Sequence, residues 1–326
     1  MPYEKAAAAL NSARSITITT HINPDGDGIG AGLALLHALE GLGRQVRFIC
    51  PSRIASLYNF LPGFERIEVI DTPEAAKALP PCEVMISGDC GDRKRLGAVW
   101  DAPRELLINL DHHATNDRFG DLNLVDEAAE SSGVVVSRLL KSLGVPLDAR
   151  LATCLYTTIV FDTGRFMHSN TTAHTFRWTA ELLDTGIDAA AINRALTYTR
   201  SLKDLAILAM GLEHLIVDTE VPSLAGIALP SERIQAVGAP EDWGDLVEVP
   251  RTLHGNRIAY LAREQADRKS VRVSLRSNPP WEVSPVAERF GGGGHRQASG
   301  CTIPGNLSDC LRELIPLLRA QATEPA

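Results

Sequence analysis

Aspartate and histidine residues directly follow three strand-like segments in the first half of the chain. They are His21, Asp25 and Asp27 after SITITT, Asp89 after VMISG, and Asp111, His112 and His113 after LLINL. Each acid alone could cap a helix or form a turn, which is the usual role of Asp after a strand. Ligands of open parallel α/β sheets bind beyond the carboxyl ends of the strands, so we expect all three groups at one shared edge.

Carboxylates gathered in one crevice would repel one another unless a cation neutralised them. Mixed aspartate and histidine donors without cysteine suit a divalent metal, with Mn²⁺ as the first expectation and Mg²⁺, Co²⁺ or Zn²⁺ as alternatives. So many ligands exceed what a single ion with open positions can use. They suit two ions roughly 4 Å apart that share a carboxylate, an arrangement used for phosphoester hydrolysis.

The segment Gly26–Ala31 also fits the G-x-G-x-x-A spacing of dinucleotide-binding loops, in which backbone N–H groups receive a pyrophosphate. Here Asp25 and Asp27 would repel that anion unless metal ions lay between them. The sequence therefore favours a metal-dependent site over a site for a bare nicotinamide cofactor, which would bind without a divalent ion.

The composition indicates an ordinary globular protein. Of 326 residues, 44% are hydrophobic and 22% charged, and the net charge is −8. These values exclude disordered, collagenous and disulfide-scaffold proteins. No apolar run reaches the ~18 residues of a membrane-spanning helix, and the N-terminal segment lacks the pattern of a secretory signal. Six cysteines without a CxxC pair indicate reduced thiols. We expect a cytoplasmic protein with no membrane partner.

The order of the predicted elements indicates two domains. Strand-like and helical segments alternate in the first part of the chain, which predicts an α/β domain with a mostly parallel sheet flanked by helices. The pattern is almost wholly helical over 131–215, and shorter strands and helices follow as a smaller α+β unit. We place the domains at 1–190 and 213–326, with a helical linker at 191–212.

Five motifs, in this order, resemble those of the DHH phosphoesterases, a family named for the triplet that stands here at 111–113. They are HINPDGDGIGAGLAL, the strand before Asp89, NLDHHATN, VFDTGRF and EVSPVAERFGGGGHRQASG. The last resembles the glycine-rich motif of the DHH-associated C-terminal domain. The resemblance covers nearly the whole chain and is greatest to compact two-domain oligoribonucleases and phosphoadenosine-phosphate phosphatases. It implies an active site in the cleft between the domains.

The resemblance also implies a role for each residue of the acidic edge. His21 and Asp25 would bind one metal ion, and Asp27, His112 and Asp162 the other. Asp89 would bridge both ions, and His113 would lie beside the scissile phosphate, so that these two are the expected catalytic residues. Asp111 would orient its neighbours. Asp162 depends most on the resemblance, because it follows a helical stretch that it could simply cap.

Basic residues of the second domain are the expected substrate contacts. The stretch Arg251–Arg276 holds seven basic residues against two acidic ones, a net charge of +5 in a chain whose total is negative. Single residues of this set would lie on a solvated strand face, but their clustering favours an anion-binding surface. From the resemblance we expect phosphate contacts at Arg276, His295 and Arg296, with Gly293 and Gly294 allowing the backbone to approach.

The expected function is hydrolysis of short oligoribonucleotides to mononucleotides and of 3′-phosphoadenosine 5′-phosphate to AMP. One alternative is a phosphodiesterase for cyclic dinucleotides such as c-di-AMP or for their linear products. An alternative of another class is a non-catalytic nucleotide-binding module, whose signature would be an incomplete ligand set. The expected partners are short single-stranded RNA or DNA and small nucleotides. The sequence leaves a homodimer open.

Overall fold

A six-stranded parallel sheet forms the centre of the first half of the chain. The computed structural model describes residues 2–198, 201–239 and 243–324, and the chain divides into two compact units, Met1–Thr199 and Arg200–Ala326. The strand order in the first unit is β3-β2-β1-β4-β5-β6, and all pairs are parallel. These strands are β1 (Ser15–Thr19), β2 (Gln45–Cys50), β3 (Ile67–Val69), β4 (Cys82–Gly88), β5 (Arg104–Asp111) and β6 (Leu122–Val125).

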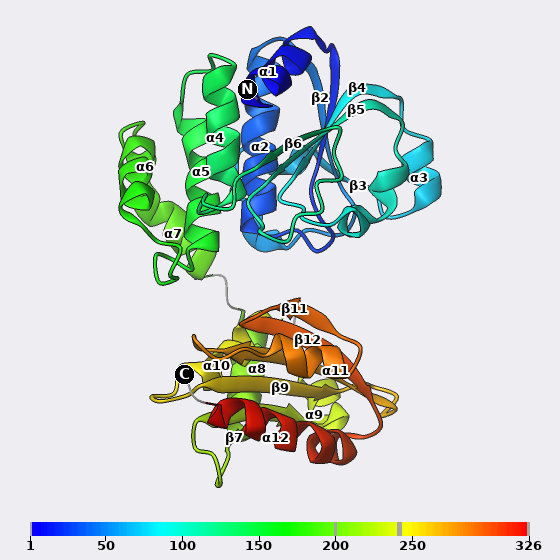
Figure 1. Ribbon diagram of the computed structural model, residues 1–326, viewed down its shortest axis with the longest axis vertical. Helices are drawn as coiled ribbons and strands as arrows, with labels where there is room; N and C mark the ends of the chain where they lie inside the picture. Colours follow the sequence, from blue (N-terminus) through cyan, green and yellow to red (C-terminus); the bar gives the residue numbers. More distant parts are fainter. Residues whose placement is uncertain (1, 199–200, 240–242, 325–326) are drawn as a thin grey trace. The chain divides into compact units, whose positions relative to one another are not determined.

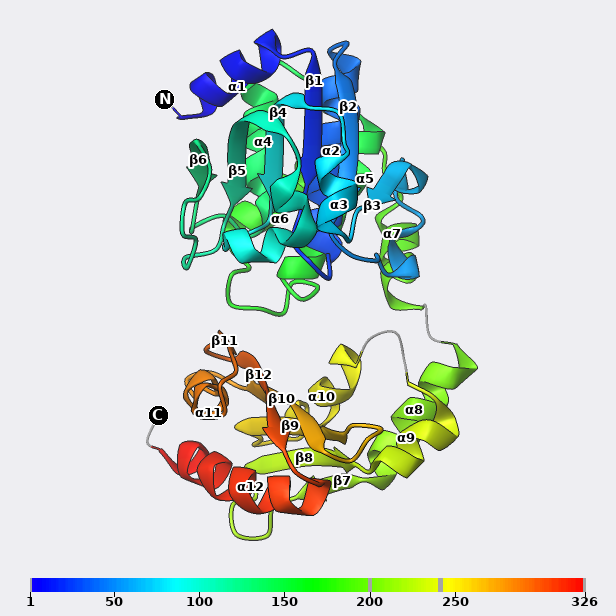
Figure 2. The ribbon, with the colours of Figure 1, turned by 90° about the vertical axis from the view of Figure 1, so that its right-hand side faces the viewer.

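Helices cover both faces of this sheet. Helices α2, α4 and α5 lie on one face, and α3 with the 3₁₀ segment η3 lies on the other (Figures 1 and 2). Strands buried on both faces carry apolar residues almost continuously, as the VMIS run of β4 does here. The predicted α/β domain with a parallel sheet flanked by helices is therefore confirmed. The helices are α1 (Pro2–Ser12), α2 (Gly26–Gly41), α3 (Pro73–Lys77), α4 (Ser132–Ser142), α5 (Ala149–Asp162), α6 (Ala173–Leu183) and α7 (Ala189–Thr197), and the 3₁₀ segments are η1 (Ser56–Tyr58), η2 (Phe64–Arg66) and η3 (Arg93–Asp101).

The strand order reverses between β1 and β4. From β1 the chain continues outward through β2 to β3, whereas β4, β5 and β6 continue on the opposite side of β1. At such a reversal the connections after the two central strands lead away from each other and leave a crevice at the carboxyl ends. The segments that carry the predicted acids follow β1, β4 and β5, so this topology brings them to the same edge.

Helix α2 supports that edge from one side and is almost wholly buried. It has no polar face, and four of its glycines let it approach its neighbours closely. A Cβ atom on Gly30 would lie 2.6 Å from the carbonyl oxygen of Cys154 in α5, and one on Gly32 would lie 2.3 Å from Cζ of Phe48 in β2. Contacts this short leave no room for a side chain.

We expect Gly30→Ala to lower the free energy of unfolding by about 1–3 kcal/mol, because the methyl group forces α2 away from α5. Gly41→Ala is the matched control in the same helix, since no atom lies within 4 Å of its would-be Cβ. This control should be neutral or stabilising by up to about 1 kcal/mol. Urea denaturation of the two variants measures the difference, and equal effects would contradict the packing described.

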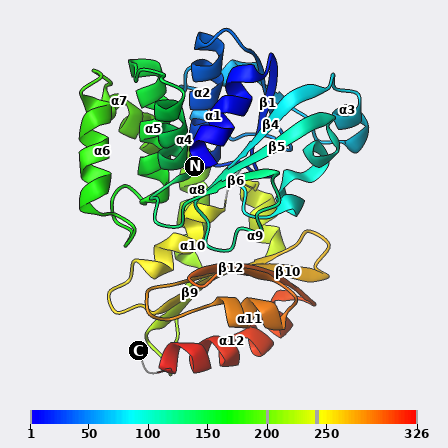
Figure 3. The same ribbon diagram turned by 45° about the horizontal axis from the view of Figure 1, so that its top comes forward.

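The second unit is built on a mixed sheet with the order β11-β12-β10-β9-β8-β7, in which β8 and β9 are parallel and the other pairs antiparallel. Helices α11 and α12 cover one face, and α8, α9 and α10 the other (Figure 3). The predicted smaller α+β unit is confirmed, whereas the boundaries at 190 and 212 stay predictions. Its elements are α8 (Leu202–Glu213), β7 (Leu215–Val217), β8 (Leu224–Leu229), α9 (Ser231–Val237), α10 (Gly244–Arg251), β9 (Ile258–Glu264), β10 (Ser270–Ser277), α11 (Ser284–Arg289), β11 (Gly293–His295), β12 (Ala298–Pro304) and α12 (Leu307–Thr323).

All six cysteines are free and buried, which agrees with the expectation of reduced thiols. Burial raises the pKa of the Cys90 thiol, next to Asp89, to about 12, so this thiol stays protonated. Within the described ranges, no helix has both the length and the apolar character needed to cross a membrane.

Candidate metal centre

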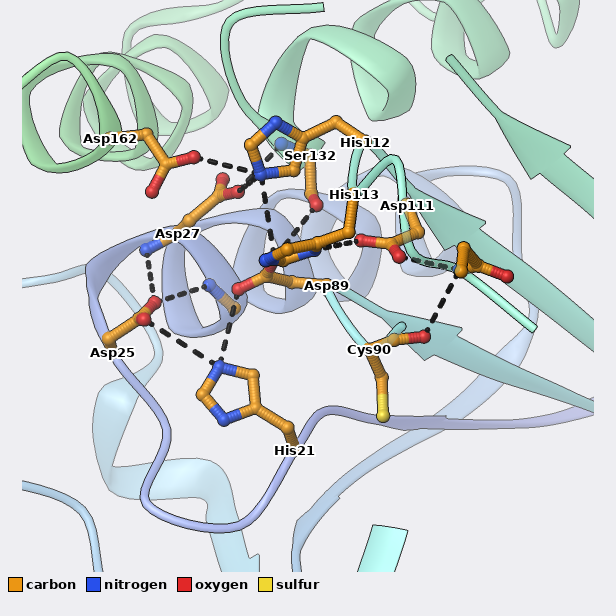
Figure 4. Close-up of polar contacts among 12 residues, drawn as sticks. His21, Asp25, Asp27, Asp89, Cys90, Asp111, His112, His113, Ser132 and Asp162 are labelled. Carbon is orange, nitrogen blue, oxygen red and sulfur yellow. Dashed lines mark hydrogen bonds and ion pairs between the residues drawn. The ribbon is translucent and has the colours of Figure 1, made fainter. Parts of the chain in front are cut away.

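Carboxylates and imidazoles meet at the carboxyl ends of β1, β4 and β5, beside the end of α5 (Figure 4). They form three groups, and the ligand atoms within each group all lie within 4.8 Å of one another. Two of these groups have the composition that the family resemblance implied for the two metal ions. The groups are His21, Asp25 and Asp89; Asp27, His112 and Asp162; and Asp89, His112 and His113.

Asp25 serves the fold and the centre with different oxygens. Its Oδ1 caps α2 by accepting hydrogen bonds from the backbone N–H groups of Asp27 and Gly28, at 3.0 and 3.3 Å. Its Oδ2 lies 3.6 Å from Nε2 of His21. The capping role that Asp after a strand often has is therefore present, but it uses only one oxygen and leaves the other for the centre.

Asp89 lies between the two main groups. Its Oδ2 is 3.3 Å from Nε2 of His21, and its Oδ1 is 3.9 Å from Nε2 of His112 and accepts a hydrogen bond of 3.1 Å from the Ser132 hydroxyl. The residue has a φ of +53°, a left-handed conformation that Asp and Asn tolerate better than most residues. This turn directs the carboxylate of Asp89 back over the end of β4, where it can reach both groups.

The buried carboxylate of Asp27 is held by the N-terminus of α4. It accepts hydrogen bonds from the backbone N–H groups of Ser132, at 2.6 Å, and Gly133, at 3.1 Å. Gly133 is required there, because a Cβ atom on it would lie 1.9 Å from Oγ1 of Thr158. We did not predict these two residues. The available signal was the small-residue sequence SSG directly before a helical run, a suitable start for a helix that binds an anion.

Both imidazoles that face the carboxylates are held through Nδ1. Nδ1 of His21 lies 2.8 Å from the carbonyl oxygen of Ile22, and Nδ1 of His112 lies 3.2 Å from that of Ala129. A proton on Nδ1 that is donated to a carbonyl leaves Nε2 with a lone pair, which is the form that binds a metal. Nη2 of Arg95 also lies 2.8 Å from Nδ1 of His21, and because a guanidinium only donates, this contact competes with the proton that Nδ1 would give to Ile22. Sequence reasoning did not find this arginine.

Asp162 is the last residue of α5, and its side chain points toward the centre. Its Oδ2 lies 2.9 Å from Nε2 of His112, whereas its backbone carbonyl accepts a hydrogen bond from Nδ2 of Asn170 at 3.2 Å. The carboxylate therefore contacts an imidazole of the centre. The resemblance, rather than the helical pattern, gave the useful prediction for this residue.

His113 and Asp111 form a hydrogen-bonded pair next to Asp89. Nδ1 of His113 is 2.7 Å from Oδ1 of the fully buried Asp111, whose other oxygen accepts a hydrogen bond from Nδ2 of Asn116. Burial opposes protonation of His113, but the bond to Asp111 together with the negative charges of Asp89 and Asp111 outweighs it and raises the pKa of the imidazole. Asn116 belongs to the NLDHHATN motif and had no predicted role.

The electrostatics of the centre call for positive charge. Burial, and then repulsion by Asp89 and Asp162, raise the pKa of Asp27 well above its usual value. Burial disfavours protonation of His21 and His112, yet hydrogen bonds and charges of the neighbouring carboxylates raise the pKa of each to about 10. Four carboxylates carry charges that two divalent cations would balance, and oxygen and imidazole donors suit Mn²⁺, Mg²⁺ or Co²⁺. The residues present therefore fit divalent metal ions.

Without divalent ions, we expect the free energy of unfolding to fall as pH rises above about 6.5. The folded-state pKa of His21 and His112, about 10, exceeds the unfolded value of 6.5. The folded state therefore binds more protons, and the stability they contribute is lost as pH rises through this window. Metal ligation requires neutral imidazoles, so the free energy of unfolding of the metal-loaded protein should not fall over this pH range. Denaturation between pH 6.5 and 9 with EDTA or Mn²⁺ tests this, and parallel curves would contradict it.

The predicted substrate residues lie in the second unit and partly have partners there. Nε of Arg276 is 2.9 Å from Oε1 of Glu248, which also pairs with Arg251, and Nη1 of Arg296 lies 3.2 Å from Oε1 of Glu282. A phosphate at Arg276 would therefore lie close to the negative charge of Glu248. Their phosphate contacts and the cleft between the domains stay predictions.

The glycines before His295 belong to or precede the β11–β12 hairpin, whose packing explains part of the run. His295 itself is exposed. Gly294 has a φ of +143°, and a Cβ on it would lie 2.5 Å from the carbonyl oxygen of Ala298. Gly293, in contrast, has open space where a side chain would be. The hairpin therefore requires Gly294, whereas the surroundings of Gly293 stay open to a ligand.

Comparison with known proteins agrees with the geometry. Residues 15–159 match the N-terminal domain of the DHH family, and residues 233–324 match the DHHA1 domain. The bifunctional oligoribonuclease and PAP phosphatase NrnA of Thermus thermophilus is 32% identical over 311 residues, which cover 94% of this chain and 90% of the relative.

Two solved structures share the fold. An exopolyphosphatase-related protein of Bacteroides fragilis superposes with a TM-score of 0.90 at 24% identity, over 99% of this chain and 98% of that one. RecJ of Thermus thermophilus in complex with Mn²⁺ superposes with a TM-score of 0.57 at 17% identity, over 99% of this chain and 55% of RecJ. With both domains matched in order and a relative matched over nearly its whole length, the chain belongs to the DHH family.

Proposed function

We propose that this protein is a divalent-metal-dependent phosphoesterase that hydrolyses short oligoribonucleotides to mononucleotides and 3′-phosphoadenosine 5′-phosphate (PAP) to AMP. The observation that carries the proposal is the pair of carboxylate–imidazole groups that meet at Asp89. The similarity to the oligoribonuclease and PAP phosphatase of Thermus thermophilus supports this choice of substrates.

In this proposal, two metal ions share the centre. His21, Asp25 and Asp89 would hold one ion, and Asp27, Asp89, His112 and Asp162 would hold the other. Bound divalent ions supply a water of lowered pKa and stabilise charge that develops on the phosphate oxygens. Oxygen-rich ligands and two imidazoles support Mn²⁺ as the first metal to test, with Mg²⁺ and Co²⁺ as alternatives. The Mn²⁺ in the RecJ complex supports a divalent ion in this fold.

The chain's own residues orient the reacting groups. A water oxygen attacks phosphorus, the bond from phosphorus to the leaving oxygen breaks, and that oxygen takes up a proton. Asp111 holds the proton on Nδ1 of His113, so Nε2 of His113 is the atom that can face the phosphate. From there His113 can donate a proton to the leaving oxygen or a hydrogen bond to a non-bridging oxygen.

A substrate panel tests the proposal. Labelled RNAs of two to ten nucleotides, PAP, c-di-AMP and its linear product are incubated at equal concentration with Mn²⁺, Mg²⁺, Co²⁺ or EDTA. We expect release of mononucleotides from the shortest RNAs and of phosphate from PAP, both abolished by EDTA. Turnover that survives EDTA would contradict a metal-dependent mechanism.

Two results would favour the alternatives. Turnover of c-di-AMP or its linear product, without turnover of RNA and PAP, would identify a cyclic dinucleotide pathway enzyme instead. Nucleotide binding without turnover of any substrate would indicate a non-catalytic binding module.

A further inference from the structure

Phe161 is an exposed aromatic residue at the rim of the centre. It precedes Asp162 in the last turn of α5, and 40% of it is exposed to solvent. An aromatic ring left in water forgoes the stabilisation that burial would give. The two residues before it in α5, Ile159 and Val160, are buried in the core, whereas Phe161 stays partly exposed.

The ring lies against the loop that carries two of the carboxylates. A Cβ atom on Gly26 would be 2.9 Å from both Cγ and Cδ2 of Phe161. Gly26 stands between Asp25 and Asp27, which belong to different ligand groups. The ring of Phe161 therefore packs on the backbone that joins Asp25 to Asp27, and part of it stays exposed to solvent.

The exposed ring of Phe161 differs from that of Phe176, a more exposed aromatic residue of the same unit. Phe176 is more exposed, at 57%, but its ring is stacked on Phe166 with centroids 5.4 Å apart and an angle of 23° between the planes. Within the described ranges, the ring of Phe161 forms no such pair. A flat, unpaired ring beside a phosphate site has the shape and chemistry to stack on a nucleobase.

We propose that Phe161 is the stacking platform for the nucleobase next to the scissile phosphate. This inference rests on the proposed function and adds to it the feature that selects nucleotides over phosphate compounds without a base. Stacking on one ring tolerates any base, because every base has a π face. The platform therefore suits an enzyme for short RNAs of mixed sequence.

The experiment compares the wild-type protein with Phe161→Ala, Phe161→Tyr and Phe176→Ala on three dinucleotides. One is the natural ApA, and the other two carry an abasic sugar on the 5′ or the 3′ side of the same phosphodiester. We expect Phe161→Ala to raise KM for ApA by about 5- to 150-fold, the usual range for loss of one stacked base. The dinucleotide that lacks the stacked base should be unaffected, Phe161→Tyr should behave like wild type, and Phe176→Ala should change nothing.

A merely structural role for Phe161 predicts other results. If the ring only supports the Gly26 loop, Phe161→Ala will weaken Mn²⁺ binding measured by calorimetry and will impair all three dinucleotides equally. That result, or a Tyr variant that behaves like Ala, would overturn the inference. Binding of a phosphorothioate ApA gives the same comparison without turnover. Absence of hydrolysis by wild type would thus count against the proposed function, and unchanged binding by Phe161→Ala against the platform.

Discussion

Asp89→Asn is expected to lower kcat for ApA by about a hundred- to a thousandfold, the scale found when one group that stabilises developing charge is lost, because Asp89 is the proposed shared ligand of both metal ions. The carboxylate of Asp89 lies between both ligand groups, 3.3 Å from His21 and 3.9 Å from His112. The amide of Asn removes one negative charge from the place where both proposed ions need it. No other carboxylate of the centre belongs to more than one of the three groups.

Asn is the appropriate substitution because the backbone of residue 89 is left-handed. With a φ of +53°, Ala would add strain to the loss of charge, whereas Asn adopts this conformation readily. The matched control is Asp92→Asn, which alters the cap of η3 on the same loop and lies outside the three groups. We expect near-normal kcat for that control. Substantial activity in Asp89→Asn with a normal melting temperature would contradict the assignment.

The fold and the first ligands could be predicted because each depends on a local pattern. Buried parallel strands have short apolar runs, and the residues after them must lie at the carboxyl edge. That rule is enough to bring the acids after β1, β4 and β5 together from the sequence alone. It could not place Asp162, because the end of a helix may point anywhere; only the VFDTGRF resemblance identified that residue.

The parts that sequence reasoning missed are contacts made by the backbone or by side chains far apart in sequence. Ser132 and Gly133 hold Asp27 through their N–H groups, across more than a hundred residues of sequence. Backbone donors leave no residue-type signature, so the SSG sequence indicated only the start of a helix. Arg95 reaches His21 because the loop of Ile22 is hydrogen-bonded to the carbonyl of Arg95, a pairing that no periodicity reveals.

The glycine run of the second unit has packing reasons that sequence reasoning did not supply. Four consecutive glycines before His295 suggested a backbone open to a phosphate. In the structure, Gly292 and Gly294 are required by close approach to the facing strand β12, since a Cβ on either would lie within 2.5 Å of a carbonyl oxygen. Packing alone therefore accounts for part of the motif, and a function for the rest depends on Gly291, Gly293 and the exposed His295.

His113→Gln is expected to lower kcat for ApA by about a hundred- to ten-thousandfold, as for other lost proton donors at a reacting oxygen. Mn²⁺ affinity should change little, because the proposed ligand sets do not include His113. A large loss of Mn²⁺ affinity would instead make His113 a ligand, in the group that it forms with Asp89 and His112.

Substrates with different leaving groups distinguish the two possible roles of His113. If Nε2 of His113 gives a proton to the leaving oxygen, a p-nitrophenyl ester of a nucleotide should largely rescue His113→Gln, because p-nitrophenolate leaves without a proton. If His113 only donates a hydrogen bond to a non-bridging oxygen, the defect should be the same for both substrates.

The pH profile gives an independent check of the acid role. Asp111 raises the pKa of His113, so an acid at this position should lose activity only as pH rises above that raised value. Asp111→Asn removes the charge that holds the proton on the imidazole and should move this alkaline limit to lower pH. The limit should vanish in His113→Gln. An alkaline limit that persists unchanged in both variants would assign the proton to another donor and leave His113 as a hydrogen-bond donor to the phosphate.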